Sequence, residues 1–363
     1  MASPAPRIGG RPTLEDLARA AGVSRTTASN AFNRPDQLSA RLRERVLGIA
    51  RDIGYGGPSP AGRMLRTGRA GAIALVFADT LGYAFDDPVS LELLKGVADE
   101  CEATSTGLLL LPSANDVGAD AVQHAAVDGF MVYCLSNASS TIARVLGRGV
   151  PVVTIDQGLR QGELASVGID DRRAARRAAE HLLGLGHRRF GVVTFELRPD
   201  GHSGRVTPER LRMADFTPSC ERLLGYADAL HAAGIDPATV PIEERPGNTE
   251  SVGAEAARAL LGSTPRPTAL LATSDRLALG VMAAAREPGL RVPADLSVVG
   301  FDDIAAAATS DPPLTTIRQP LRAKGEAAAR RLLAPRQTRR HQILPTELVV
   351  RGSTAPSSAY RKL

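Results

Sequence analysis

The sequence predicts an α/β protein with a small three-helix head of helix-turn-helix type and a body of two doubly wound parallel-sheet subdomains. Apolar side chains recur at helical spacing in three short segments of the first 57 residues. After residue 70, short apolar runs alternate with helical stretches, a pattern typical of parallel strands covered on both faces. Residues 1–70 hold 12 Arg, no Lys and 5 acidic residues, whereas the remainder holds 32 basic and 34 acidic residues. A basic head of this kind indicates a polyanionic partner.

Composition bounds the class of protein. The 363 residues suffice for two or three domains, and 43% hydrophobic with 23% charged residues is ordinary for a globular protein. The chain has no apolar run of the roughly 18 residues that span a bilayer, and residues 1–12 read as a disordered lead-in without a signal-peptide core. We therefore expect a cytoplasmic protein without a membrane segment. Three cysteines without metal-type spacing (Cys101, Cys134 and Cys220) are expected to be free thiols.

The head begins with Thr13, which is placed to cap a helix and stands three residues before Asp16. A second helix follows Ser24, with Ala28, Ala31 and Phe32 on its apolar face. A third starts near Ser39 and stops at Gly54. The second helix therefore exposes its first turn, which is where a recognition helix presents side chains to base edges.

The body is predicted from its apolar runs. The expected strands are 72–78, 107–112, 129–134, 150–156, 190–195, 268–275 and 296–303. The expected helices between them are 88–104, 139–148, 171–185, 219–233, 250–261 and 276–286. Seven or more strands suit two subdomains with a ligand cleft between them.

Seven stretches resemble the lactose and galactose repressor (LacI–GalR) family, in the family's order. The head matches in "TLEDLARAAGVSRTTASNAFN" and "LRERVLGIARDIGY", and the hinge in "GRMLRTGRAGAIALV". The body matches in "HLLGLGHRRFGVV", "SCERLLGYADAL", "LATSDRLALGVMAA" and "LSVVGFDDIAAAATSDPPLTTIRQP". The resemblance runs from Thr13 to about residue 352. It implies a homodimeric bacterial transcription factor, expected to be a repressor, with a periplasmic-binding-protein-like body that binds a small-molecule effector.

The departures from the family pattern are specific. Ala28 stands where a bulky aliphatic residue is usual, and Asn30 where Arg or His is common. The hinge is one residue longer than the common form, with Gly62 at a usual alanine. The segment 196–218 is longer than the usual connection. The C-terminal tail has no heptad pattern, so a dimer is expected rather than a tetramer.

The resemblance assigns residues to operator DNA, expected to be double-stranded and pseudo-palindromic. Arg25, Thr26 and Asn30 match the base-reading positions; for Arg25 a phosphate contact remains the alternative. The positions that match backbone-phosphate contacts are Thr13, Ser24 and Asn33.

In the hinge, Ser59 and Pro60 have the signature of a helix start, but Gly62 and the short length predict a helix that forms only on DNA. Leu65 matches the family leucine that enters the minor groove, and Arg66 would flank it on phosphate. A plain linker is the alternative.

For the effector, the resemblance indicates Asp156, Arg222, Ser274 and Asp302, three of which also follow predicted strand ends. Carboxylates and a guanidinium suit a polyhydroxylated molecule, whose hydroxyls donate to the acids. With 4% aromatic residues, stacking on the effector is expected to be sparse, and Tyr83, Phe85 and Phe195 are further candidates that core packing explains equally well. A nucleoside or another metabolite stays open.

Two other classes of protein, a secreted ligand receptor and an enzyme, agree less well with the sequence. A secreted receptor on the same fold conflicts with the basic head and the missing signal peptide. An enzyme would need a site such as a nucleophile elbow, but in "GHSG" (201–204) Arg205 replaces the last glycine of the motif. His181 and His187 flank a helix end, where capping is favoured over metal binding. We therefore expect no enzyme activity, cofactor or metal.

The predicted organisation follows from these assignments. Residues 13–57 form the head, 58–70 the hinge and 71–355 the effector-binding and dimerisation body, followed by a tail, 356–363. In the body, one subdomain comprises about 71–169 and 320–342, and the other about 170–318 and 343–355. Neither the effector nor the operator sequence follows from the residues alone.

Overall fold

A computed structural model describes residues 12–57, 60–113, 117–136, 139–157, 164–334 and 341–357. The chain divides into two compact units, Met1–Gly71 and Ala72–Leu363. No helix in these described ranges is long and apolar enough to cross a bilayer. The predicted lead-in 1–12 lies outside the described residues except for Pro12.

The first unit contains the three predicted helices, with their starts fixed by side-chain caps. They are α1 (Leu14–Ala21), α2 (Arg25–Asn33) and α3 (Ala40–Asp52), with a short 3₁₀ turn η1 (Pro35–Gln37) before α3. Thr13 forms a reciprocal capping box with Asp16, and the hydroxyls of Ser24 and Ser39 accept from backbone N–H groups of the following turn. Gly22 ends α1 in the left-handed conformation, at φ 62°.

Small residues let the three helices share one core. Ala28 and Ala31 of α2 are fully buried against Leu17 and Val46, so the alanine that departs from the family pattern is a packing residue. Two arginines of α3 act inside the unit. Their guanidinium groups donate to the carbonyls of Ala21 and Ala31 at 3.2 Å, at or near the C-terminal ends of α1 and α2.

The hinge contains a helix, α4 (Pro60–Thr67). The segment is thus helical in this structure, and the expectation that the helix forms only on DNA stays a prediction. Its end is closed by Gly68, whose N–H donates to the Met64 carbonyl at 2.8 Å with φ 66°. Ser59, the expected N-cap, lies outside the described residues.

Two parallel sheets form the second unit, as the fold class requires. The first sheet has the strand order β12-β5-β4-β3-β1-β2, and all its pairs are parallel. Its strands are β1 (Ala72–Phe77), β2 (Gly107–Pro112), β3 (Phe130–Tyr133), β4 (Val152–Ile155), β5 (Ala165–Ile169) and β12 (His341–Leu344).

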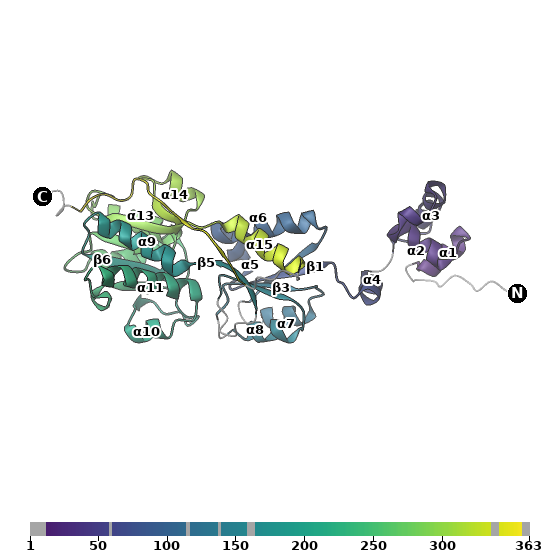
Figure 1. Ribbon diagram of the computed structural model, residues 1–363, viewed down its shortest axis with the longest axis horizontal. Helices are drawn as coiled ribbons and strands as arrows, with labels where there is room; N and C mark the ends of the chain where they lie inside the picture. Colours follow the sequence, from purple (N-terminus) through teal and green to yellow (C-terminus); the bar gives the residue numbers. More distant parts are fainter. Residues whose placement is uncertain are drawn as a thin grey trace. The chain divides into compact units, whose positions relative to one another are not determined.

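Alternate residues of these strands face opposite helical layers. In β1, Ile73 and Leu75 pack against α6 (Pro88–Ala103) and α15 (Leu321–Leu333), which lie side by side (Figure 1). Ala74 and Val76 face α7 (Val117–His124) and α8 (Ser140–Gly147) instead. Helices on both faces make this sheet doubly wound.

The second sheet has the order β13-β11-β10-β9-β6-β8-β7, with antiparallel pairing only at the edge strands β7 and β13. Its strands are β6 (Phe190–Phe195), β7 (Gly204–Arg205), β8 (Ile242–Arg245), β9 (Ala269–Ala272), β10 (Ser297–Asp302), β11 (Thr315–Arg318) and β13 (Glu347–Val349).

Helices also cover both faces of the second sheet. One face packs on α9 (Asp171–Gly184) and α11 (Thr217–Ala232), and the other on α12 (Glu250–Leu261) and α13 (Asp275–Arg286). Helices α9 and α11 can approach closely because Gly225 of α11 has no side chain. A Cβ at this position would lie 2.1 Å from the Arg172 carbonyl of α9. The shorter helices are α5 (Leu81–Asp86), α10 (Pro208–Arg212), η2 (Pro237–Thr239) and α14 (Ala305–Thr309).

The chain passes three times between the subdomains, after β5, after β11 and after β12. The last crossing follows Leu344, which pairs with Ile169 in the first sheet. The first subdomain therefore extends two residues beyond the predicted boundary at 342, because strand pairing continues there.

The C-terminal segment packs on the second subdomain, and the two histidines hold it. His187 is buried and its ring contacts Thr268, Ser297 and the Ala355 carbonyl, each at 3.0 Å. The His181 ring contacts the Thr354 hydroxyl at 3.0 Å. The capping role expected for these histidines is therefore wrong, because their rings bind residues distant in sequence.

Candidate functional site

The exposed face of α2 is set by its first turn. Arg25 and Thr26 are exposed, while Ala28 beneath them is fully buried. Asn30 is half-buried, and its amide donates to the Gln37 side chain at 3.1 Å, so a neighbouring turn holds its orientation. Of the three predicted base-reading residues, two therefore have exposed side chains and the third is held by a hydrogen bond.

The predicted phosphate-contacting residues already serve the helices. Thr13 and Ser24 use their hydroxyls as N-caps, and Asn33 donates to the Ser29 carbonyl at 3.1 Å. All three side chains are exposed. In the hinge, Leu65 of α4 is 85% exposed, whereas the side chain of Arg66 lies outside the described residues.

A cavity lies between the two subdomains of the body, at the carboxyl ends of their strands. Its volume is about 160 Å³, which is on the order of ten times the volume that one buried water needs. Its polar walls include Asp79, Tyr83, Asp87, Ser90, Tyr133, Asp156, Glu196, Arg222, Asn248, Asp302 and Gln319. This composition suits a small polar molecule rather than a polymer.

Arg222 is buried on α11 and is fixed by acceptors on several sides. Its Nε donates to Asp171 Oδ1 at 2.8 Å and its Nη1 to the Thr273 carbonyl at 2.6 Å. The guanidinium carbon lies 3.7 Å from the centre of the Phe301 ring. Burial raises the pKa of Asp171 although Arg222 opposes that shift. Arg222 is thus a preorganised donor in the cavity wall.

Asp302 is the last residue of β10 and has φ 122°, a conformation in which backbone strain is expected and which clusters at functional sites. Its Oδ1 lies 3.5 Å from Arg222 Nη1 and accepts from Gln319 Nε2 at 2.6 Å. Burial raises the pKa of Asp302 to about 7, although Arg222 and the Gln319 hydrogen bond oppose the shift.

Asp156 follows β4 with φ 53° and is paired with a buried lysine. Lys324 of α15 is 0% exposed, and its Nζ donates to Asp156 Oδ2 at 2.5 Å and to Gln319 Oε1 at 2.6 Å. The other carboxylate oxygen, Oδ1, is buried without a hydrogen-bond partner among the described residues. A chain of polar contacts therefore runs from Asp156 through Lys324 and Gln319 to Asp302, linking the two subdomains.

Two of the predicted effector residues do not line the cavity. Ser274 is the N-cap of α13, accepts from Leu277 N–H and donates to Asn248 Oδ1, which does line the cavity. Phe85 is 55% exposed on α5 and lies outside the cavity wall. Capping of α13 explains where the Ser274 hydroxyl points, and contact of these two residues with the effector stays a prediction.

Aromatic side chains are more frequent in the cavity wall than the 4% in the whole chain suggested, while sparse stacking on the effector stays a prediction. Five of the thirteen aromatic side chains of the chain line this one cavity: Phe77, Tyr83, Tyr133, Phe195 and Phe216. Phe77, Tyr133 and Phe195 are the last residues of their strands, at the edge of the sheets that borders the cavity. Tyr83 and Phe216 lie on the segments that follow two of these strands. Apolar ring faces are therefore available to a ligand.

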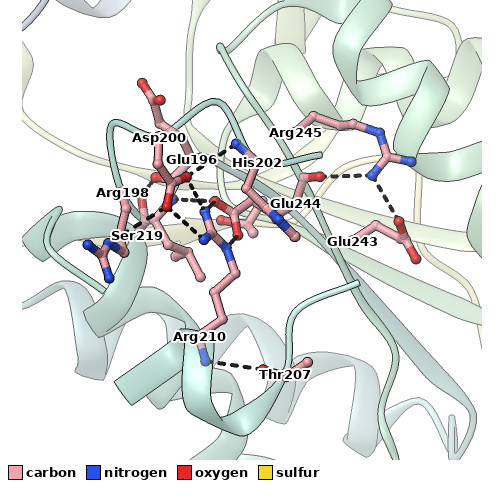
Figure 2. Close-up of polar contacts among 12 residues, drawn as sticks. Glu196, Arg198, Asp200, His202, Thr207, Arg210, Ser219, Glu243, Glu244 and Arg245 are labelled. Atoms are coloured by element: carbon pink, nitrogen blue, oxygen red, sulfur yellow. Dashed lines mark hydrogen bonds and ion pairs between the residues drawn. The ribbon is translucent and has the colours of Figure 1, made fainter. Parts of the chain in front are cut away.

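In the long segment 196–218, one arginine binds both the segment itself and the neighbouring strand β8, as Figure 2 shows. Arg210 donates to both oxygens of Asp200 at 2.9 and 3.0 Å and to Glu244 at 2.5 and 2.7 Å. Glu244 of β8 is fully buried and also accepts from Leu197 N–H at 2.8 Å. The hydrogen bonds from Arg210 lower the pKa of Asp200 to about 2. The segment thereby brings Glu196 and Phe216 to the cavity wall.

The same segment contains the "GHSG" motif. Ser203 is exposed, and Gly204 begins the two-residue edge strand β7. A nucleophile elbow requires a sharp turn between a strand and a helix, so the local structure differs from that motif.

Sequence reasoning missed Lys324, Gln319, Glu196, Asp79 and Asn248. One signal was present for Lys324: it lies on the apolar face of α15, three residues after Leu321 and four before Ala328. A lysine on such a face needs a buried partner. The other residues follow strands and carry no distinguishing pattern.

Comparisons with known proteins match both units. The model of bacterial regulatory proteins of the lacI family matches residues 13–57, and a periplasmic binding protein-like domain matches residues 179–354. An HTH-type transcriptional regulator of Mycobacterium tuberculosis is 44% identical over 97% of this chain and 99% of its own. The HTH-type transcriptional repressor CytR of Escherichia coli is 31% identical over 94% of this chain and 96% of its own. The crystal structure of the lac repressor dimer bound to operator and the anti-inducer ONPF is similar with a TM-score of 0.77 and 26% identity, covering 95% of this chain and all of that chain.

Proposed function

The chain belongs to the lacI family of DNA-binding transcriptional regulators, and we propose that it is a repressor whose operator affinity is set by a small molecule in the body's cavity. The observation that carries the proposal is a cavity walled by both subdomains, in which Asp156 belongs to one and Arg222 and Asp302 to the other. A ligand held between them favours one arrangement of the subdomains over another. Since operator DNA lies in the cytoplasm of bacteria, the protein acts there.

In this proposal, two copies of α2 read two half-sites of a pseudo-palindromic operator. Arg25, exposed at the first turn, is placed to contact guanine O6 and N7, with Thr26 and Asn30 beside it. Thr13, Ser24 and Asn33 fix the register on phosphates. The exposed Leu65 enters the minor groove, with Arg66 on the adjacent phosphate.

Selection of duplexes from a random pool with the full chain tests the DNA part. We expect an enriched pseudo-palindrome, and we expect Arg25→Ala to relax the preference at one base pair per half-site. Arg19→Ala is the matched control, because Arg19 is 63% exposed on α1 and pairs with Asp16. If Arg25→Ala weakens binding to all sequences equally, Arg25 contacts phosphate and the base-reading role is wrong.

Release of the selected operator tests the effector part. Metabolites that raise the melting temperature of the full chain are added to the operator complex, and binding is followed by fluorescence anisotropy. We expect at least one stabilising compound to change operator affinity. Asp302→Asn should abolish this response while retaining operator binding; a normal response would refute the role of the cavity.

A further inference from the structure

The cavity between the subdomains is predominantly acidic. Five carboxylates line it (Asp79, Asp87, Asp156, Glu196 and Asp302), against one cationic side chain, Arg222. The charged groups paired directly behind the wall are Lys324, Arg276 and Asp171. When all of these groups are ionised, six carboxylates face three cations, an excess of three negative charges.

Glu196 and Asp79 contribute most to this imbalance. Glu196 follows β6 in one subdomain, and Asp79 follows β1 in the other. Burial raises the pKa of Glu196 to about 6, and all the charged neighbours that add to the shift are carboxylates: Asp79, Glu244 and Asp200. The two acids are thus like charges on opposite walls of one cavity.

Two nearby arginines, Arg210 and Arg245, are paired with acids that do not line the cavity, as Figure 2 shows. Arg210 binds Asp200 and Glu244, and Arg245 binds Glu243 at 2.9 Å. Arg222, in the wall itself, is held by Asp171 and the Thr273 carbonyl. A phosphate or carboxylate ligand requires cationic donors that are free to bind it.

Two further features of the wall favour donors and cations. Asp156 Oδ1 is buried without a hydrogen-bond partner among the described residues, and Asp87 Oδ1 also lacks one, although it lies 3.6 Å from Arg276 Nη1, a buried donor that is likewise without a hydrogen-bond partner there. The wall also contains five aromatic side chains, whose π faces attract cations.

We propose that the effector is an uncharged or cationic molecule rich in hydrogen-bond donors, a hydroxyl- or amine-bearing compound, and that Asp79 and Glu196 exclude phosphorylated and carboxylated metabolites. This inference rests on the proposed function, because it names the chemical class of the ligand that controls operator binding. Hydroxyl or ammonium donors complete the open carboxylate oxygens, and an anion meets uncompensated negative charge.

A matched screen on the full chain tests the proposal by thermal shift and calorimetry. Each set contains an uncharged parent, an amine and an anion, for example glucose, glucosamine and glucose 6-phosphate, or adenosine and its 5′-monophosphate. We expect every stabilising compound to be a parent or an amine, and its anionic analogue to bind at least about tenfold more weakly, as like-charge repulsion requires.

An anion that binds as tightly as its parent overturns this inference and leaves the proposed function standing. If no compound of any charge class stabilises the chain or alters operator binding, the effector-controlled function fails and the inference fails with it. The two failures are therefore distinguishable.

Charge-neutralising variants assign the selectivity to residues. For a compound that binds, Asp79→Asn with Glu196→Gln should reduce the ratio of parent to anion affinity by about tenfold or more. Glu209→Gln is the matched control, since Glu209 is 67% exposed on α10 of the same segment and outside the cavity wall. An unchanged ratio in the double variant, or an equal change in the control, overturns the role of Asp79 and Glu196.

Discussion

Replacing Lys324 by methionine tests how strongly the site contributes to the stability of the body. The Lys324 side chain is fully buried, and its Nζ bonds Asp156 Oδ2 and Gln319 Oε1 at 2.5 and 2.6 Å. Methionine has a similar length and no charge, so the packing changes little. The change leaves Asp156 buried without its cation.

Breaking a buried ion pair by removing one partner costs about 3–5 kcal/mol of unfolding free energy. For a large domain each kcal/mol lowers the melting temperature by about 2 °C, so we expect a decrease of about 6–10 °C. Lys95→Met is the matched control, because Lys95 pairs with Glu92 at 2.6 Å on the surface of α6, where both side chains are more than 40% exposed. That pair is worth about 0.5 kcal/mol or less.

The assay is calorimetric and urea unfolding of the full chain, at equal protein concentration for each variant because the melting temperature of a protein that self-associates depends on its concentration. Adding Asp156→Asn to Lys324→Met removes the unpaired charge and should recover more than about 1 kcal/mol. If Lys324→Met loses no more stability than Lys95→Met, the buried pair does not support the site and the reasoning is refuted.

Three further predictions use other parts of the chain. Gly225→Ala should destabilise the body by about 1–3 kcal/mol, because its Cβ would lie 2.1 Å from the backbone carbonyl of Arg172; Gly147→Ala, with open space around the added Cβ, should not, and equal melting temperatures would contradict the close packing. Leu65→Ser should weaken operator binding in a gel-shift assay without changing body stability, since Leu65 is 85% exposed; unchanged DNA bending and affinity would favour a plain linker. Because burial raises the pKa of Asp302 to about 7, above the ordinary value of about 3.9, its stabilising contribution is full below about pH 4 and is lost as pH rises through 7; Asp302→Asn should flatten this decline in urea unfolding, and parallel pH profiles would contradict the shift.

The sequence determined the fold class and the order of elements. The capping residues Thr13, Ser24 and Ser39 start the helices that were expected from them, and the apolar runs after residue 70 became the strands of two parallel sheets. These features could be predicted because capping and periodicity act within a few residues of the chain. Six strands were not among those expected: β5, β7, β8, β11, β12 and β13. All six lie at or next to a sheet edge. Burial is incomplete along five of them, whereas β11 is mostly buried but only four residues long.

The site was predictable only in part. Asp156, Arg222 and Asp302 line one cavity; the family resemblance indicated all three, and the strand-end rule also indicated Asp156 and Asp302. The same rule placed Ser274 there, but its hydroxyl caps α13 and reaches the cavity only through Asn248. A residue at a strand end can point into a cleft or back onto the next helix, and the local sequence does not distinguish these outcomes.

Tertiary structure alone decided what surrounds those residues. Lys324 is 168 residues from Asp156, and Arg210 is 34 residues from Glu244, yet each pair is in direct contact. Five aromatic side chains from separate segments converge on a cavity in a chain with few aromatics. The three crossings between subdomains bring these segments together. Local sequence fixes the type of each element, whereas the charge and shape of the cavity depend on which distant elements meet, and that is set by the packing of the whole body.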